Sequence, residues 1–352
     1  MSRSSTVRSD LLLLLAAVIW GFAFVAQRMG MEHIGPFLFN GIRFAMGAGV
    51  LLVVVRMREA WMRGSGDEET RRQGEEETRR QGEEETRGGG DAIESLTADR
   101  RPPTADRRLL TPGAILLGLI LFAGATFQQA GIVYTSAGNA GFITGLYVIL
   151  VPVFGIFSGQ RAGVNLWGGA IIATIGLYFL SVTESFTMSK GDLLVLTGSV
   201  FWAVHVLYTG WLSPRTSVLR LAITQYTVCA VLSMISAFIF ESNTFAGIYQ
   251  AAIPLLYGGF LSVGVAFTLQ IIGQKKAPPA HTAIILSFEA VFAVIGGVMI
   301  LAETMTERKW IGCALMLTGM VLAQVRSRQS AVGSRQSAVS GRKIPNNHEP
   351  SP

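Results

Sequence analysis

Charge is scarce along most of this chain. Asp, Glu, Lys and Arg make up only 15 % of its 352 residues, and half of these charged residues lie between positions 56 and 108. A soluble protein cannot cover its surface with so few charges, whereas helices that face lipid need none. Apolar residues account for 50 % of the composition. The sequence therefore predicts an integral membrane protein that crosses the bilayer many times.

Cysteine is also rare, and motifs for catalysis or cofactor binding are absent. The two cysteines, Cys229 and Cys313, lie in separate apolar segments, so they define neither a disulfide framework nor a metal site. The sequence contains no GxxxxGK(S/T) loop for ATP phosphates and no HExxH pair for zinc. Basic residues outside the charge-rich segment lie mainly at the ends of apolar runs, so the net charge of +6 indicates no nucleic-acid partner. We expect no enzymatic activity, no metal and no cofactor.

Apolar runs long enough to cross a membrane recur along the chain. A helix needs roughly 20 apolar residues to span a hydrocarbon core of about 30 Å. The runs predict ten spans, near residues 11–30, 37–55, 110–131, 139–158, 166–183, 192–211, 220–240, 251–272, 279–301 and 309–326. The first run resembles a secretory signal peptide but lacks a convincing cleavage site, so a retained helix is expected. The predicted fold class is an all-α integral membrane protein of the cell membrane.

Basic residues in the short loops predict the orientation, because Lys and Arg are enriched on the cytoplasmic side. With the N-terminus inside, the inner side receives Arg3, Arg8, Arg161, Arg215, Arg220, Lys275, Lys276, Arg326 and Arg328. The outer side then receives only Arg28, Lys190, Arg308 and Lys309. Both termini are therefore predicted to be cytoplasmic.

The two halves of the chain resemble each other. Matched residues lie 143 positions apart in the later part of each half, in the pairs Trp167–Trp310, Gly169–Gly312 and Gly176–Gly319. Earlier in each half the spacing is larger, since Trp20 and Trp202 are 182 positions apart. The difference equals the extra length of the charge-rich loop. Five spans per half is an odd number, which predicts two inverted repeats, an arrangement suited to alternating access.

Short tandem repeats mark the charge-rich segment as an insertion. GDEETRRQ, GEEETRRQ and GEEETRGG follow one another from Gly66. Such composition favours disorder over a packed fold. The predicted organisation is a cytoplasmic N-terminus (1–10), a first repeat (11–183) that contains the insertion (56–108), a second repeat (191–326) and a disordered cytoplasmic tail (327–352). Whether the insertion binds a partner is left open.

Each half carries a series of characteristic segments, and the order of these segments is the same in both halves. The first half carries IWGFAFVAQR (19–28), PFLFNGIR (36–43) and YTSAGNAGFITGLYVILVPVFG (134–155), and the second carries GDLLVLTGSVFWA (191–203) and HTAIILSFEAVFAVIGG (281–297). In this order they resemble the EamA-type transporters of the drug/metabolite transporter superfamily. The resemblance implies ten helices, cytoplasmic termini, and movement of small metabolites without ATP hydrolysis.

We therefore expect a carrier that moves a small polar metabolite, such as an amino acid or a drug-like compound, by alternating access. Coupling to protons or to exchange is expected, with export as the favoured direction. A lipid-linked group or a nucleotide-sugar is an alternative cargo for the same fold. A membrane scaffold or receptor that transports nothing is a further alternative. The expected partners are the solute, the bilayer and protons, and the oligomeric state is left open.

Two ionisable side chains stand out within the predicted spans. Glu289 lies near the middle of the ninth span, where a charged carboxylate costs at least ~2.5 kcal/mol. It is either a neutral packing residue or a group that exchanges protons or binds a substrate amine. His205, in the sixth span, is either a hydrogen-bonded structural residue or a proton relay.

Arg43 and two tryptophans are further candidates. Arg43 lies about two turns into the second span, so it either snorkels to the outer headgroups or binds a substrate carboxylate. Trp20 and Trp202 lie deep in their spans and not in the interfacial belt where Trp usually collects. Each is expected to line a cavity or to pack between the halves.

The remaining candidates are polar or mechanical. Thr144, Tyr147 and Gln270 are expected to donate or accept hydrogen bonds along the substrate pathway. Pro152 and the Gly296–Gly297 pair are interpreted as hinges, because such residues weaken a helix locally.

Deleting residues Gly66 to Arg101 should leave transport nearly unaltered, because both ends of the insertion are predicted to lie on the cytoplasmic side. Solute flux into proteoliposomes, normalised to the amount of assembled protein, checks this. Loss of assembled protein on deletion would contradict a passive insertion.

Overall fold

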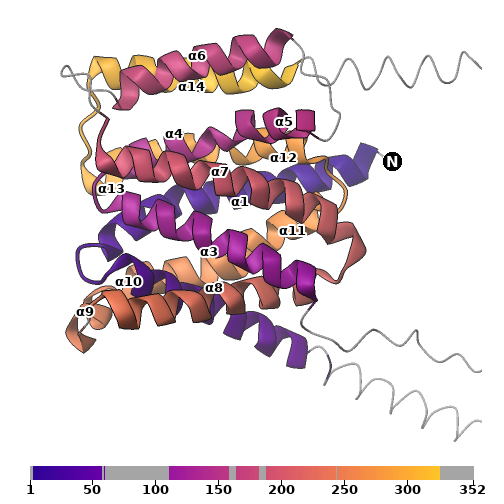
Figure 1. The fold of residues 1–352 in the computed structure, drawn as a ribbon, viewed down its shortest axis with the longest axis vertical. Helices are drawn as coiled ribbons and strands as arrows, with labels where there is room; N and C mark the ends of the chain where they lie inside the picture. The colour runs from indigo at the N-terminus through magenta and orange to yellow at the C-terminus, as the bar shows by residue number, and fades with distance from the viewer. Residues whose placement is uncertain are drawn as a thin grey trace, which may run out of the picture.

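All regular structure that can be described in the protein is helical. A computed structural model describes residues 3–57, 59, 111–157, 164–181, 188–242 and 244–325, and no strand occurs among them. Most of the predicted insertion and all of the predicted tail lie outside these residues. Figure 1 displays the helices side by side along a common direction. We call the end of the bundle at which α1 begins the N-face; it is on the right in Figure 1.

The helices follow the predicted spans closely. In order they are α1 (Arg3–Gly30), the unlabelled helix Pro36–Met57, α3 (Pro112–Ile132), α4 (Ala137–Gly145), α5 (Tyr147–Phe157), α6 (Val164–Ser181), α7 (Lys190–Leu212), η1 (Ser213–Arg215), α8 (Val218–Phe240), α9 (Phe245–Gln250), α10 (Ala252–Leu256), the π-helix η2 (Tyr257–Phe267), α11 (Thr268–Gln274), α12 (Pro279–Leu286), α13 (Glu289–Leu301) and α14 (Glu307–Val325). Several of these helices begin with a polar N-cap residue. Thr111, Ser136 and Ser189 each accept a hydrogen bond from a backbone N–H in the first turn of the helix that follows.

Eight helical segments of the described chain are long and apolar enough to cross a membrane. They are Val7–Gly30, Pro36–Met57, Pro112–Ile132, Ala137–Phe157, Lys190–Arg215, Val218–Phe240, Ala252–Gln274 and Pro279–Leu301. This confirms a multi-pass all-α membrane protein. Of the other two predicted spans, α6 has the shorter apolar stretch Trp167–Leu180 and α14 begins with charged residues. Ten spans, the inverted repeats and the orientation stay predictions.

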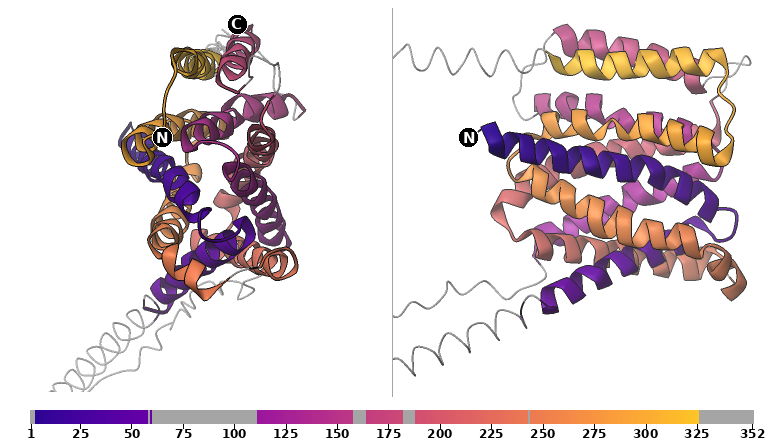
Figure 2. Two further views of the ribbon diagram at one scale, coloured as in Figure 1. Left: turned by 90° about the vertical axis from the view of Figure 1, so that its left-hand side faces the viewer. Right: turned by 180° about the vertical axis from the view of Figure 1, so that it is seen from behind.

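Helices α6 and α14 lie side by side as a pair at one edge of the bundle in all views (Figures 1 and 2). Glycines let their backbones approach closely. A Cβ on Gly176 would lie 2.7 Å from the Gly312 carbonyl oxygen, and one on Gly319 would lie 2.5 Å from that of Gly169. The two contacts correspond under the 143-residue offset, because Gly176 matches Gly319 and Gly312 matches Gly169. This correspondence is expected of two helices related by a two-fold axis.

Two of the long helical segments are interrupted near their middle. The first breaks between α4 and α5 at Leu146, and the second breaks between α12 and α13 at Ser287 and Phe288. The 143-residue offset places Leu146 opposite Glu289, the first residue of α13, so the interruptions nearly correspond. The predicted hinges lie elsewhere, with Pro152 inside α5 and the Gly296–Gly297 pair inside α13.

Two clusters of buried apolar side chains form the interior. One is built mainly by α1, α4, α5, α7, α12 and α13, and the other by the helix Pro36–Met57, α3, α8, η2 and α11. Trp20 of α1 and Trp202 of α7 pack against both clusters. The two tryptophans therefore mark the junction between the clusters.

Replacing Gly176 by Ala should lower the stability of the protein by ~1–3 kcal/mol, because the added Cβ would lie 2.6 Å from the Met316 nitrogen. Thermal unfolding in detergent micelles measures the change. Gly168→Ala is the matched control on the same helix, since its Cβ would meet only one atom, at 4.0 Å. Both substitutions improve helix propensity by up to ~1 kcal/mol. Equal unfolding temperatures for the two variants would contradict the close helix contact.

Candidate functional site

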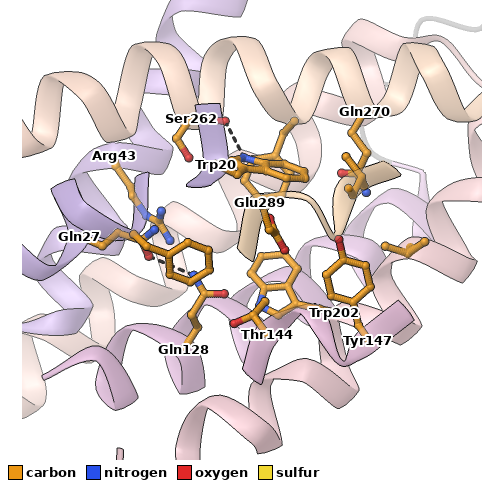
Figure 3. A pocket seen from close by; sticks show the side chains of 14 residues that line it. Trp20, Gln27, Arg43, Gln128, Thr144, Tyr147, Trp202, Ser262, Gln270 and Glu289 are labelled. Atoms are coloured by element: carbon orange, nitrogen blue, oxygen red, sulfur yellow. Dashed lines mark hydrogen bonds between the residues drawn. The ribbon is translucent and has the colours of Figure 1, made fainter. Parts of the chain in front are cut away.

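A pocket lies where the two apolar clusters meet. About 480 Å³ of space not filled by atoms, part of it open to solvent, lies in and around it. Side chains from both halves of the chain line it: Trp20, Phe24, Gln27, Arg43, Gln128, Thr144, Tyr147, Trp202, Val206, Ser262, Phe267, Gln270, Leu286 and Glu289. Figure 3 displays these side chains converging from helices that are far apart in sequence.

Seven of the eight side chains predicted for a substrate or proton pathway line this pocket. They are Trp20, Arg43, Thr144, Tyr147, Trp202, Gln270 and Glu289. The eighth, His205, is fully buried beside it, with its ring edge-on to Trp202 and Phe267. Its Nε2 lies 2.9 Å from Gln225 Oε1, within hydrogen-bond distance. The functional roles of all eight side chains stay predictions.

Arg43 forms one end of the pocket. Its side chain is only 2 % exposed, so it points into the bundle and does not snorkel to the membrane surface. The Nε donates to Asn40 Oδ1 at 2.9 Å, and the guanidinium carbon lies 4.9 Å from the ring centre of Phe44 and 5.8 Å from that of Phe39. These contacts hold the guanidinium without neutralising its charge. No carboxylate of the described residues forms an ion pair with it.

Sequence reasoning missed two amides beside Arg43. Gln128 Nε2 donates to Gln27 Oε1 at 3.1 Å, and Gln27 Nε2 donates to the Ala23 carbonyl, also at 3.1 Å. Figure 3 places the amide pair next to the guanidinium. The available signal was a polar amide inside an apolar run, the same signal that identified Gln270.

Glu289 also lines the pocket, 4 % exposed, at the point where α12 and α13 are interrupted. As the first residue of α13 it lies at the positive end of that helix, which favours an acidic side chain. No basic residue in the described part of the chain pairs with it. The Tyr147 hydroxyl lies beside the carboxyl group (Figure 3), although it does not meet the geometry of a formed hydrogen bond.

Four polar atoms of the lining are buried and have no hydrogen-bond partner. They are Thr144 Oγ1, Tyr147 OH, Trp202 Nε1 and Gln270 Oε1. A buried polar atom without a partner costs roughly 1–3 kcal/mol. Native proteins therefore satisfy such atoms with water or a ligand. The tryptophans differ in this respect, since Trp20 Nε1 donates to the Ser262 carbonyl at 3.3 Å.

Polar contacts tie the halves of the chain together at both ends of the bundle. Near the N-face, His281 Nε2 lies 2.7 Å from Asp10 Oδ1. At the opposite end, the Thr135 hydroxyl donates to Asp192 at 2.5 Å. There Glu303 also accepts hydrogen bonds from the first two backbone N–H groups of α4, at 2.6 and 3.1 Å. Ala302, with a φ of 51°, turns the chain after α13 and brings Glu303 back to this position.

Comparison with known families decides the identity of this bundle. The model of the EamA-like transporter family matches residues 7–70 and 189–324. The chain belongs to the EamA-like transporter family. Both matched stretches contribute residues to the pocket, among them Trp20 and Arg43 from the first and Trp202 and Glu289 from the second.

Relatives in bacteria and archaea span most of the chain. An uncharacterized transporter of Archaeoglobus fulgidus is 26 % identical, and the alignment covers 90 % of this chain and 86 % of the relative. The uncharacterized transporter YoaV of Bacillus subtilis is 23 % identical, with 87 % and 92 % covered. The uncharacterized inner membrane transporter YedA of Escherichia coli K12 is 24 % identical, with 87 % of each chain covered.

A solved crystal structure has the same fold, with a TM-score of 0.61 and 18 % identity over 94 % of this chain and 99 % of its own. Family membership and the apolar helices together identify a multi-pass transporter of the cell membrane. The transporter family also implies a small-molecule substrate.

Replacing Glu303 by Ala should remove the partner of the first two N–H groups of α4 and cost ~0.5–2 kcal/mol, as loss of a helix cap does. Backbone hydrogen exchange at Ala137 and Gly138 should accelerate, which mass spectrometry of peptides from this segment measures. Glu307→Ala, at an exposed position in the first turn of α14, is the control. Unchanged exchange in the Glu303 variant would show that this cap does not form.

Proposed function

We propose that the protein is a carrier that moves a small polar metabolite bearing both an acidic and a basic group, such as an amino acid or a drug-like compound with both groups, by alternating access. One observation carries the proposal. A buried guanidinium and a buried carboxyl group line the same pocket, and neither has a partner of opposite charge in the described residues.

Arg43 is the proposed site for the acidic group of the solute. A guanidinium presents a rigid fork of donors that matches a carboxylate, and it stays charged inside a protein. Its fixation by Asn40 and two aromatic rings means that little ordering is required when a solute binds. The bound carboxylate would supply the negative charge that no described residue of the protein provides to Arg43.

Glu289 is the proposed site for the basic group and for a proton. A carboxylate binds an ammonium group, but a protonated carboxyl cannot form that ion pair. Proton and solute amine therefore compete for one group. Competition of this kind produces exchange of proton for solute, so an inward proton gradient would drive export.

Alternating access is supported by the near-symmetry of the framework. Interruptions at corresponding places divide the α4–α5 and α12–α13 segments, and the pocket lies between contributions from both halves. Two similar halves can exchange conformations, which makes an inward-open and an outward-open state close in energy. The contacts at each end, Asp10 with His281 and Thr135 with Asp192, are the proposed closures of the two states.

The experiment that tests the proposal is a flux assay in proteoliposomes loaded with a mixed pool of metabolites and subjected to a pH gradient. Selective, gradient-dependent movement of amphoteric solutes supports the carrier. Movement of solutes that carry only one of the two charged groups, at the same rate, would reject the two-point recognition. No movement of any solute by folded protein would shift support to a scaffold or receptor.

Glu289→Gln should abolish pH-driven flux while leaving the fold intact, because glutamine preserves the shape but neither titrates nor pairs with an amine. Binding of a carboxylate-only analogue at Arg43, followed by quenching of tryptophan fluorescence in the pocket, should persist. The exposed Glu307→Gln is the control. Proton dependence that is unchanged in the Glu289 variant would remove Glu289 from the mechanism.

A further inference from the structure

A row of buried polar side chains leads from the neighbourhood of the pocket toward the N-face. His205, Thr209 and Ser213 are four residues apart along α7 and the start of η1, so they share one helix face. All three are fully buried. Each has a polar atom with no hydrogen-bond partner: His205 Nδ1, Thr209 Oγ1 and Ser213 Oγ. At 1.5 Å per residue they cover about 12 Å of the bundle.

A second row faces the first from α11. Gln270 lines the pocket, and Gln274 lies one turn closer to the N-face. Gln274 Nε2 donates to the Val206 carbonyl at 3.0 Å, which places α11 against this part of α7. The Oε1 atoms of both glutamines are buried and without a partner. Acceptors on α11 thus lie opposite the unpartnered groups of α7.

Neighbouring helices add further unpartnered atoms. Gln225 of α8 contacts His205 through its Oε1, but its Nε2 has no hydrogen-bond partner. The Thr282 hydroxyl on α12 has no hydrogen-bond partner either. Helix α12 reaches α7 at Gly210, where a Cβ would lie 2.7 Å from Pro279. Unpartnered groups therefore surround the row from three helices packed around α7.

Leaving so many polar atoms unpaired is expensive. Each costs roughly 1–3 kcal/mol, and the lipid around the bundle offers no water to any of them. Buried water molecules resolve this cost where several polar groups lie within reach, since each water makes two to four hydrogen bonds. Hydroxyl, amide and imidazole groups from facing helices are polar partners of the kind that such water molecules require.

We propose that these side chains hold a file of water molecules that connects the pocket to the N-face, the side predicted to be cytoplasmic. The exposed Lys275 and Lys276 after α11, and the exposed Arg215 of η1, mark the place where the file reaches solvent. Resting on the proposed function, the file is the route by which a proton passes between Glu289 and the cytoplasm when the solute amine is not paired with that carboxyl group. His205 is its titratable member, with Glu289 and Tyr147 at the pocket end.

A labelling experiment tests the file without any transport measurement. Single cysteines replace His205, Thr209 or Val204 in a background with Cys229→Ala and Cys313→Ala. Hydroxyl radicals generated from water in place by a brief X-ray pulse oxidise side chains that water touches, so the cysteines at positions 205 and 209 should be oxidatively labelled, which mass spectrometry measures. Val204 is the matched control, because it has the same depth as His205 but is exposed on the lipid side of α7. Equal, negligible labelling at all three positions would overturn the file.

A second variant tests what the file conducts. Thr209→Val keeps the shape of the side chain and removes its hydroxyl, so proton-driven flux should fall about tenfold. Solute exchange at equal pH on both sides should be unchanged. Thr197→Val is the control, since that hydroxyl already donates to the Leu193 carbonyl on the same helix.

The outcomes separate the two proposals. Unchanged proton-driven flux in Thr209→Val, together with higher thermal stability, would identify an ordinary buried hydroxyl and overturn the proton route. An equal loss of exchange and driven flux would assign the effect to the solute site and also overturn it. Absence of transport by the unmodified protein would reject the proposed function, while the labelling result would still decide whether the file exists.

Discussion

The apolar environment of the bundle is the constraint on which the rest of the structure depends. Lipid cannot satisfy a polar group, so polar atoms in the interior must pair with each other or with something brought in. Several do pair across the halves, as Trp20 does with the Ser262 carbonyl and Gln128 with Gln27. Many of those that remain unpartnered lie in the pocket or along the row that runs from it toward the N-face. In the two proposals above, solute and water satisfy these groups.

The same constraint explains how Arg43 is held. An ion pair inside the protein would compete with a solute for the guanidinium and would have to be broken at every cycle. Contacts with Asn40, Phe39 and Phe44 fix the group while leaving its charge uncompensated. Cation–π contacts are suited to this because they attract a cation without donating a countercharge. In the proposed function, this uncompensated charge lowers the stability of the protein but leaves Arg43 free to bind the acidic group of the solute.

Much of the fold could be predicted because the membrane imposes a length on every crossing helix, and long apolar runs are visible in sequence. The pocket residues were predictable for a related reason, since a polar or charged residue in such a run is costly in lipid and is therefore expected to face the interior of the bundle. His205 lies beside the pocket and not in its lining, a distinction that sequence could not make because it does not show which side of α7 faces the cavity. The interruptions at Leu146 and Ser287 could not be predicted either. They depend on packing between helices, which no local signal encodes.

The near-symmetry of the framework and the asymmetry of its charges have different consequences. In the proposed alternating-access cycle, symmetry keeps the two end states close in energy, but a wholly symmetric pocket would present the same groups to both sides of the membrane. Leu146 occupies the position that matches Glu289, and Gln225 the position that matches Arg43, so each charge occurs once. In the structure Gln225 contacts His205 and not the pocket. In the proposed mechanism one half therefore supplies the anion site and the other supplies the proton site. A transporter built in this way can cycle between similar states and still couple solute to protons through one carboxyl group.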